Sequence, residues 1–205
     1  MKLTNSQIRE KYKKFAPKYD LLEAIPDFLV LRRFRKRLLQ NAHGRVLEVA
    51  AGTGRNFKYY KNCKVTAVDI TPEMLNIARK KSKKIGLNAE FNIMDTESLK
   101  FKNNSFDAVV STLSLCTFPN PFKALKEMSR VCRKNGRILL LDHGISSSRW
   151  IRSMQKKMAP KHFEMIRCRL DIDPFGIAKK AGLGVIKSKR HVFGMFYIIE
   201  AKPKK

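Results

Sequence analysis

The chain has 205 residues, of which 43% are hydrophobic, and its 44 Lys and Arg residues against 17 Asp and Glu residues give a formal net charge of +27. This length fits one domain, and the apolar content excludes a disordered chain. No uncharged apolar stretch reaches the ~18 residues of a membrane-spanning helix, and the first residues lack the apolar core of a secretory signal. We therefore expect a cytoplasmic protein or one of an organelle matrix.

The excess of positive charge is the unusual feature of the composition. Such a field attracts polyanions, which include nucleic acid, anionic lipid and acidic proteins. A lysine-rich surface in a compositionally biased genome would give the same count without any such partner. The charge therefore indicates classes of partner and does not choose among them.

The cysteine pattern predicts no metal site. Cys63, Cys116, Cys132 and Cys168 form no C-x-x-C pair, and no histidine stands at zinc-finger spacing from a cysteine pair. We expect reduced and mostly buried thiols.

The first 43 residues are predicted to be helical and basic. Asn5 or Ser6 should cap a helix that runs to about Phe15 and ends at Pro17, and Pro26 should open a second helix. The second helix carries apolar residues at helical spacing among basic ones: Leu31, Phe34 and Leu38 among Arg32, Arg33, Arg35, Lys36 and Arg37.

From Gly44 onward, short apolar runs alternate with helical patterns, which is typical of a parallel sheet covered on both faces. The predicted strands are 45–49, 65–68, 89–93, 106–111, 137–141, 185–189 and 193–201. The predicted helices are 54–60, 72–84 with Thr71 as its cap, 121–133 and 174–181, and Gly136 should end the turn before the fifth strand. The connection between the last two strands is too short for a crossover helix, so they should pair antiparallel. The expected fold is α/β, a doubly wound, mostly parallel seven-stranded sheet with N-terminal helices and a C-terminal hairpin.

A glycine-containing loop follows the first predicted strand. Residues 46–56 read VLEVAAGTGRN, and Gly52 and Gly54 lie where doubly wound sheets bind nucleotide-like ligands. A dinucleotide fingerprint would have a third glycine at the position of Phe57. Glu48 would repel a pyrophosphate but suits a ligand with an ammonium or a sulfonium. The loop thus favours a cationic adenosyl ligand over NAD.

Acidic residues follow the next two predicted strands. Asp69 comes 21 residues after Glu48 and can accept hydrogen bonds from ribose hydroxyls. Asp95 is placed to accept the amine of an adenine, with Met94 and Ile70 covering the ring. A lone G-x-G is often only a turn, and Asp69 alone could be a helix cap. Their succession after three successive strands predicts a cofactor site.

Over residues 44–201 the chain resembles the class I S-adenosylmethionine-dependent methyltransferases. The resemblance rests on the glycine loop, Asp69, Asp95 and the FDAVVS run at 106–111. Within the family the chain is similar to the ubiquinone/menaquinone C-methyltransferases and the bacterial phosphatidylethanolamine N-methyltransferases. The resemblance implies S-adenosyl-L-methionine as cofactor and S-adenosyl-L-homocysteine as product. The cofactor-binding residues that follow are Tyr19, Glu48, Ala50, Gly52, Gly54, Asn56, Asp69, Ile70, Met74, Met94, Asp95, Thr96 and Thr112.

One domain over 1–205 is expected, with an N-terminal helical lid at 1–43, a cofactor-binding core at 44–143, a substrate cap at 144–172, and a C-terminal helix and hairpin at 173–205. His143 follows the fifth strand, and its ordinary pKa suits a catalytic base. Capping a loop or binding substrate would explain His143 equally well. The resemblance implies that Tyr19 closes over the cofactor, whereas Tyr12 and Tyr59 are expected to pack. Cys116 is expected to be a small residue lining the site rather than a nucleophile, because nothing basic accompanies it.

The segment 145–171 is where this fold builds its substrate cap. Trp150, Met154 and Met158 recur there at helical spacing among many Lys and Arg residues, as in an interfacial helix. The helix at 26–41 has the same mixture. Both could instead be ordinary amphipathic helices packed on the sheet. Nucleic acid competes for the charge, but only Trp150 and Phe163 could stack on bases.

These features predict an S-adenosylmethionine-dependent methyltransferase that acts by in-line transfer on a small lipophilic acceptor, either a phospholipid headgroup amine or a quinone precursor. An anionic membrane is the expected partner surface. The alternative is an RNA- or ribosome-associated protein of the same fold with little or no turnover of small molecules. Residues 111–114 lack the Asn/Asp-Pro-Pro-Tyr string by which the amino-methylating nucleic-acid enzymes of this fold resemble one another. The sequence carries no signal for an oligomeric state.

Overall fold

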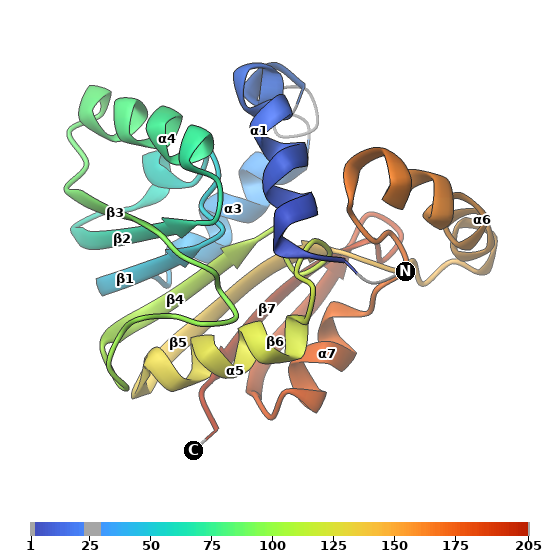
Figure 1. The fold of residues 1–205 in the computed structure, drawn as a ribbon. Coiled ribbons are helices and arrows are strands. Elements are labelled where there is room, and N and C mark those ends of the chain that lie inside the picture. Colours follow the sequence, from blue (N-terminus) through green and yellow to red (C-terminus); the bar gives the residue numbers. More distant parts are fainter. Residues whose placement is uncertain (1–2, 23–29, 205) are drawn as a thin grey trace.

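The computed structural model describes residues 3–22 and 30–204, and Figure 1 shows the fold. The helices are α1 (Asn5–Leu22), α3 (Arg32–Leu39), α4 (Pro72–Lys84), α5 (Pro121–Val131), α6 (Arg149–Ile166) and α7 (Pro174–Lys180), with a 3₁₀ turn η2 (Phe57–Tyr59). The strands are β1 (Gly44–Val49), β2 (Cys63–Asp69), β3 (Ala89–Ile93), β4 (Phe106–Thr112), β5 (Cys132–His143), β6 (Gly184–His191) and β7 (Phe196–Lys202).

The seven strands form one sheet in the order β3-β2-β1-β4-β5-β7-β6. The first five run parallel, and β7 pairs antiparallel with both β5 and β6. The predicted fold and its terminal hairpin are thus confirmed. The hairpin is turned so that β7, the last strand in sequence, lies inside the sheet and β6 lies at its edge.

Helices cover both faces of the sheet (Figure 1). On one face α3 and α4 enclose a core that contains Leu38, Val65 and Ala78. On the other face α5 and α7 enclose a core that contains Leu125 and Ala178. Burial on both faces explains why the central strands are almost wholly apolar. Figure 1 shows α1 and α6 outside these two layers, with α1 between α4 and α6 in this view.

The predicted end of the first helix at Pro17 is wrong, because α1 continues through Pro17 to Leu22. A proline removes one backbone hydrogen bond, but the turn that follows is held from outside. Asp20 accepts a hydrogen bond from the Thr53 hydroxyl at 2.7 Å and pairs with Lys81 at 2.5 Å. The predicted start at Pro26 of the second helix lies outside the described residues.

The cap of α1 also differs from the prediction. Thr4 Oγ1 accepts a hydrogen bond from the Gln7 backbone N–H at 3.3 Å, and Gln7 Oε1 accepts one from the Thr4 N–H at 3.2 Å. This reciprocal pair is a capping box. It leaves the Asn5 side chain available for a contact in the site described below.

Two other predicted boundaries shift. The helix predicted at 54–60 is only the short turn η2. The turn predicted to end at Gly136 belongs to β5, which begins directly after α5. Its pairing with β4 advances from Phe106↔Cys132 to Ala108↔Arg137, so the intervening residues form a bulge. Among the described residues, no helix has the length and apolar character to cross a bilayer.

Candidate functional site

A pocket of about 830 Å³, its open mouth included, lies at the carboxyl ends of β1, β2 and β4 and beneath α1. Parallel sheets of this topology bind ligands at that edge. The pocket brings together most of the residues predicted to bind the cofactor: Tyr19, Glu48, Ala50, Gly52, Asp69, Ile70, Met74, Met94, Asp95, Thr96 and Thr112. Gly54 and Asn56 are not among its lining residues.

Asp69, which was predicted to bind the ribose hydroxyls, is held in place by the glycine loop and by the residue that caps α4. Its Oδ2 accepts a hydrogen bond from the Gly52 N–H and its Oδ1 accepts one from the Thr71 N–H, both at 2.8 Å. Gly52 has a φ of +55°, in the left-handed region that favours glycine. Burial raises the pKa of Asp69, and the two amides oppose that rise.

Glu48 lies on the floor of the pocket, and both of its oxygens already accept hydrogen bonds. Oε1 receives the Asn56 side-chain amide at 2.9 Å, and Oε2 receives the Tyr60 hydroxyl at 2.8 Å. Asn56 therefore supports the floor from below. Burial raises the pKa of Glu48 to about 7, against the lowering effect of these two hydrogen bonds and of Arg35.

Gly54 has a packing role in the loop, and its contact with the cofactor stays a prediction. Its φ is +75°, and a Cβ at this position would come within 2.5 Å of the Phe57 ring. The glycine thus allows Phe57 to be buried under the loop.

Arg35 is a pocket residue that the sequence analysis did not single out. Only 4% of it is exposed, and its Nη1 donates to Asn56 Oδ1 and to Thr112 Oγ1, both at 2.8 Å. A guanidinium in this position can bind the carboxylate of an amino-acid moiety. The sequence did carry a signal for the burial of Arg35. It stands four residues after Leu31 and three before Leu38, so helical spacing places it on their buried side.

The first helix forms one wall of the pocket. Asn5, Ile8, Tyr12 and Tyr19 all line it, and Asn5 Nδ2 donates to Asp95 Oδ2 at 2.7 Å. Tyr12 packs against the cluster of Leu3, Ile8 and Phe163, as predicted, and it lines the pocket as well. Burial raises the pKa of the Tyr12 hydroxyl, with a further rise from Tyr19.

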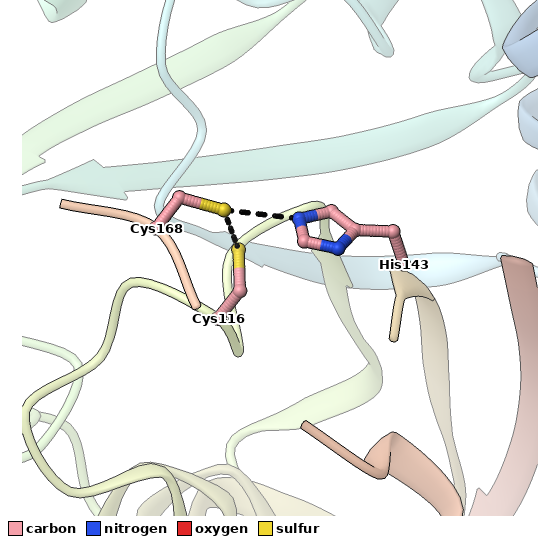
Figure 2. Close-up of side chains that lie close together, drawn as sticks. All are labelled: Cys116, His143 and Cys168. Atoms are coloured by element: carbon pink, nitrogen blue, oxygen red, sulfur yellow. Dashed lines mark hydrogen bonds between the residues drawn. The ribbon is translucent and has the colours of Figure 1, made fainter. Parts of the chain in front are cut away.

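Beside the pocket lies a cluster that the sequence analysis did not foresee (Figure 2). His143 Nε2 is 3.0 Å from Cys168 Sγ, and Cys168 Sγ is 3.1 Å from Cys116 Sγ. The pKa of Cys168 is lowered, first by the hydrogen bond with Cys116 and then by His143, while that of Cys116 is raised. The expectation that nothing basic accompanies Cys116 is thus wrong.

His143 is not among the residues that line the pocket. Its Nε2 points to Cys168 instead, and its role as a base stays a prediction. All four cysteines are free and buried, as predicted.

Comparison with known proteins gives the same class as the pocket. Residues 47–140 match the methyltransferase domain family. The yeast mitochondrial methyltransferase OMS1 (Saccharomyces cerevisiae) is 28% identical over 94% of this chain and 45% of its own length. A phosphatidylethanolamine N-methyltransferase of Cereibacter sphaeroides is 36% identical over 57% of this chain and 59% of its own length. A demethylmenaquinone methyltransferase of Thermus thermophilus is 34% identical over 64% of this chain and 63% of its own length.

A solved structure shares the fold at low sequence identity. It is a chain from the complex between the Haloferax volcanii Trm112 methyltransferase activator and a methyltransferase, with a TM-score of 0.77 and 14% identity over 97% of this chain and 98% of that one. The chain spans between 45% and 63% of the length of the three relatives above.

Sheet order, pocket and family match together define the class. Residues 47–140 carry a methyltransferase domain of the class I S-adenosylmethionine-dependent kind, and S-adenosylmethionine is the cofactor that the pocket of this domain fits.

Proposed function

We propose that this protein transfers a methyl group from S-adenosylmethionine to a small lipophilic acceptor at the surface of an anionic membrane. The acceptor classes are a phospholipid headgroup amine and a quinone-type ring. Relatives named for both reactions align with more than half of the chain.

The observation that carries the proposal is the exposed apolar side of α6. Trp150, Met154 and Met158 follow one another at steps of four residues, and they are 74%, 43% and 52% exposed. The buried residues of the same helix, Gln155, Ala159 and Phe163, lie on another side. The alternative that the Trp and Met residues pack on the sheet is therefore wrong, and they have the exposure that insertion into an interface requires.

The position of α6 relates this surface to the pocket. Phe163 packs in one cluster with Leu3 and Ile8, and Tyr12 and Ile70 pack against that cluster. Ile8, Tyr12 and Ile70 also line the pocket. An acceptor with an acyl or prenyl tail could thus place its tail at α6 and its reactive end beside the lid.

The second basic helix contributes charge rather than insertion. In α3 the apolar Leu38 and Leu39 are buried, whereas Arg32, Arg33, Lys36 and Arg37 are exposed. Basic residues near an anionic surface each add about 1 kcal/mol.

The protein's part in the reaction is binding and alignment. When bound, the cofactor supplies an activated methyl group. Asp69 and Asp95 would hold its nucleoside end and Arg35 its carboxylate. Tyr12 and Tyr19 on α1 would limit access of water. Positioning the acceptor atom about 3–3.5 Å from the methyl carbon is then the main requirement.

The test is transfer of radiolabelled methyl groups into separated lipid, RNA and protein fractions, with phosphatidylethanolamine and a demethylated quinone as defined acceptors. We expect label in the lipid fraction, and its loss in Asp69→Ala. Label confined to RNA would overturn the proposal in favour of a nucleic-acid substrate. An absence of label in every fraction, with cofactor binding intact, would also contradict it.

A further inference from the structure

The cluster of Cys116, His143 and Cys168 consists of three donor groups that meet from separate parts of the chain. Cys116 lies in the loop after β4, His143 is the last residue of β5, and Cys168 follows the end of α6. One donor atom from each residue lies within 4.8 Å of the other two. Figure 2 shows both sulfur atoms and the imidazole edge turned toward a common point.

We propose that these three residues bind a Zn²⁺ ion with a fourth coordination position left for water or another small ligand. Two thiolates and one imidazole are a donor set that zinc prefers. Tetrahedral zinc with Zn–S near 2.3 Å and Zn–N near 2.0 Å keeps its donor atoms roughly 3.5–3.8 Å apart. The two separations at Cys168, 3.0 and 3.1 Å, must lengthen by less than about 1 Å to reach that arrangement, and the third pair, Cys116 and His143, already lies within 4.8 Å.

Charge balance supports a divalent cation in this place. Cys116 and Cys168 are buried, so a bound ion must leave no uncompensated charge there, and both thiol protons would pass to solvent as it binds. Zn²⁺ with two thiolates and a neutral imidazole forms a neutral unit. His162 also contacts Cys168 but is not part of the group whose donor atoms converge.

A disulfide between the two cysteines explains the cluster less well. It would account for the two sulfur atoms but not for the imidazole nitrogen that points at one of them.

The ion would fasten the substrate cap to the core. Cys168 begins the segment that leaves α6, and the next residue, Arg169, donates its backbone N–H to the Cys116 carbonyl at 3.1 Å. Thr117 and Phe118, directly after Cys116, line the cofactor pocket. Zinc would therefore fix the pocket wall and the cap to each other, and His143 would act as a ligand rather than as a base.

The inference is independent of the proposed function, because it is tested without an acceptor. The full chain, purified under reducing conditions and stripped with a chelator, is titrated with Zn²⁺ and with Co²⁺, whose thiolate charge-transfer absorption reports sulfur ligation. We expect one equivalent of metal per chain and a rise in Tm on zinc binding. Cys116→Ser, Cys168→Ser and His143→Ala should each weaken binding more than about 100-fold, since even outer-shell changes cost 10–100-fold.

Cys63→Ser and Cys132→Ser are the matched controls, because both residues are buried free thiols outside the cluster. They should bind metal like the wild type. If the reduced wild-type protein binds Zn²⁺ more weakly than a Kd of about 1 μM, or not at all, the inference is overturned, whether or not the variants fold. Equal loss of binding in the two control variants would overturn it as well.

Discussion

At the scale of single residues, Asp69 carries the clearest prediction. Asp69→Ala should weaken S-adenosylmethionine binding roughly 100-fold, because two hydrogen bonds to a carboxylate contribute about 3 kcal/mol together. Calorimetry measures the effect. Asp107→Asn is the control, since Asp107 also accepts a backbone N–H, that of Arg45, but lies at the opposite end of the sheet. Unchanged affinity in Asp69→Ala would remove this residue from the site.

The role of Arg35 can be tested by comparing ligands that carry the amino-acid end of the cofactor with one that lacks it. Arg35→Met should weaken binding of S-adenosylmethionine and S-adenosylhomocysteine by tenfold or more, because a charge-assisted hydrogen bond contributes about 1.5–3 kcal/mol. Methylthioadenosine lacks the amino-acid end, so its affinity should change little. Arg37→Met, on the exposed side of the same helix, is the control. An equal loss for all three ligands would show that Arg35 only supports the floor of the pocket.

Glu48 should make cofactor binding depend on pH. Its pKa is raised to about 7, and Arg35, Asp69 and Tyr60 are the ionisable groups that act on it. A cationic ligand favours the ionised carboxylate, so affinity should rise with pH through 7 and level off above it. Because ligand binding requires Glu48 to release one proton, affinity should increase roughly tenfold from pH 6 to pH 8. Calorimetry on Glu48→Gln should give a flat profile; the same slope in that variant would assign the effect to another group.

The same raised pKa has the opposite sign for folding. Because protonated Glu48 is favoured in the folded state, its contribution to stability is complete below the unfolded pKa near 4.5 and is lost as pH rises through about 7. In urea unfolding at pH 5 and pH 8, the wild type should lose up to about 3 kcal/mol more than Glu48→Gln, because buried Asp142, whose pKa is raised to about 8, loses stability equally in both proteins. A loss of equal size in the variant would contradict this.

At the scale of helices and strands, the prediction concerns α6. Trp150→Ala should weaken binding to anionic vesicles even at low salt, because insertion is lost. Reversing the charge of Lys156 and Lys157 should weaken it mainly through lost attraction. Cofactor affinity should stay the same in both variants, since none of Trp150, Lys156 and Lys157 lines the pocket.

Vesicle sedimentation with rising anionic content measures these effects. Ile85→Ala and charge reversal at Lys83 and Lys84 are the controls, because these residues are exposed at the end of α4. If the protein stays in the supernatant at every lipid composition, α6 is not an interfacial helix. If the control variants lose binding as much as the α6 variants, the charge acts without a defined surface.

Local pattern explains which elements the sequence could predict. The strand at 89–93 matches β3, because apolar content and turn residues bound a strand without help from the rest of the fold. The end of α1 was mispredicted at Pro17. Asp20 contacts Thr53 and Lys81, which are distant in sequence, and these contacts stabilise the last turn of the helix. Local propensity yields to such tertiary contacts.

The candidate site divides in the same way. The glycine loop, Asp69 and Asp95 are each fixed by a strand end, so their order along the chain predicted their meeting. The meeting of Cys116, His143 and Cys168 depends on how the segment after α6 returns to the core. No spacing in the sequence encodes that return, so the spacing of Cys and His residues predicted no metal site.

At the scale of the whole molecule, the net charge of +27 predicts two opposite responses to salt. Self-repulsion among basic residues destabilises the compact state. Raising NaCl from about 10 mM to about 150 mM shortens the Debye length from about 30 Å to about 8 Å. Tm should therefore rise, by roughly 2–4 °C for each kcal/mol of repulsion relieved. Over the same range, binding to anionic vesicles should weaken, because the attraction is screened too.

Scanning calorimetry and vesicle sedimentation on the same salt series test both responses. Charge reversal at Lys83 and Lys84 together lowers the net charge by four and should reduce the rise in Tm. It should leave the salt dependence of vesicle binding almost unchanged, because that dependence belongs to the basic residues of α6 and α3. A Tm that falls with salt would mean that attractive ion pairs outweigh the repulsion. The basic surface would then have to be explained by the stability of the fold rather than by a partner.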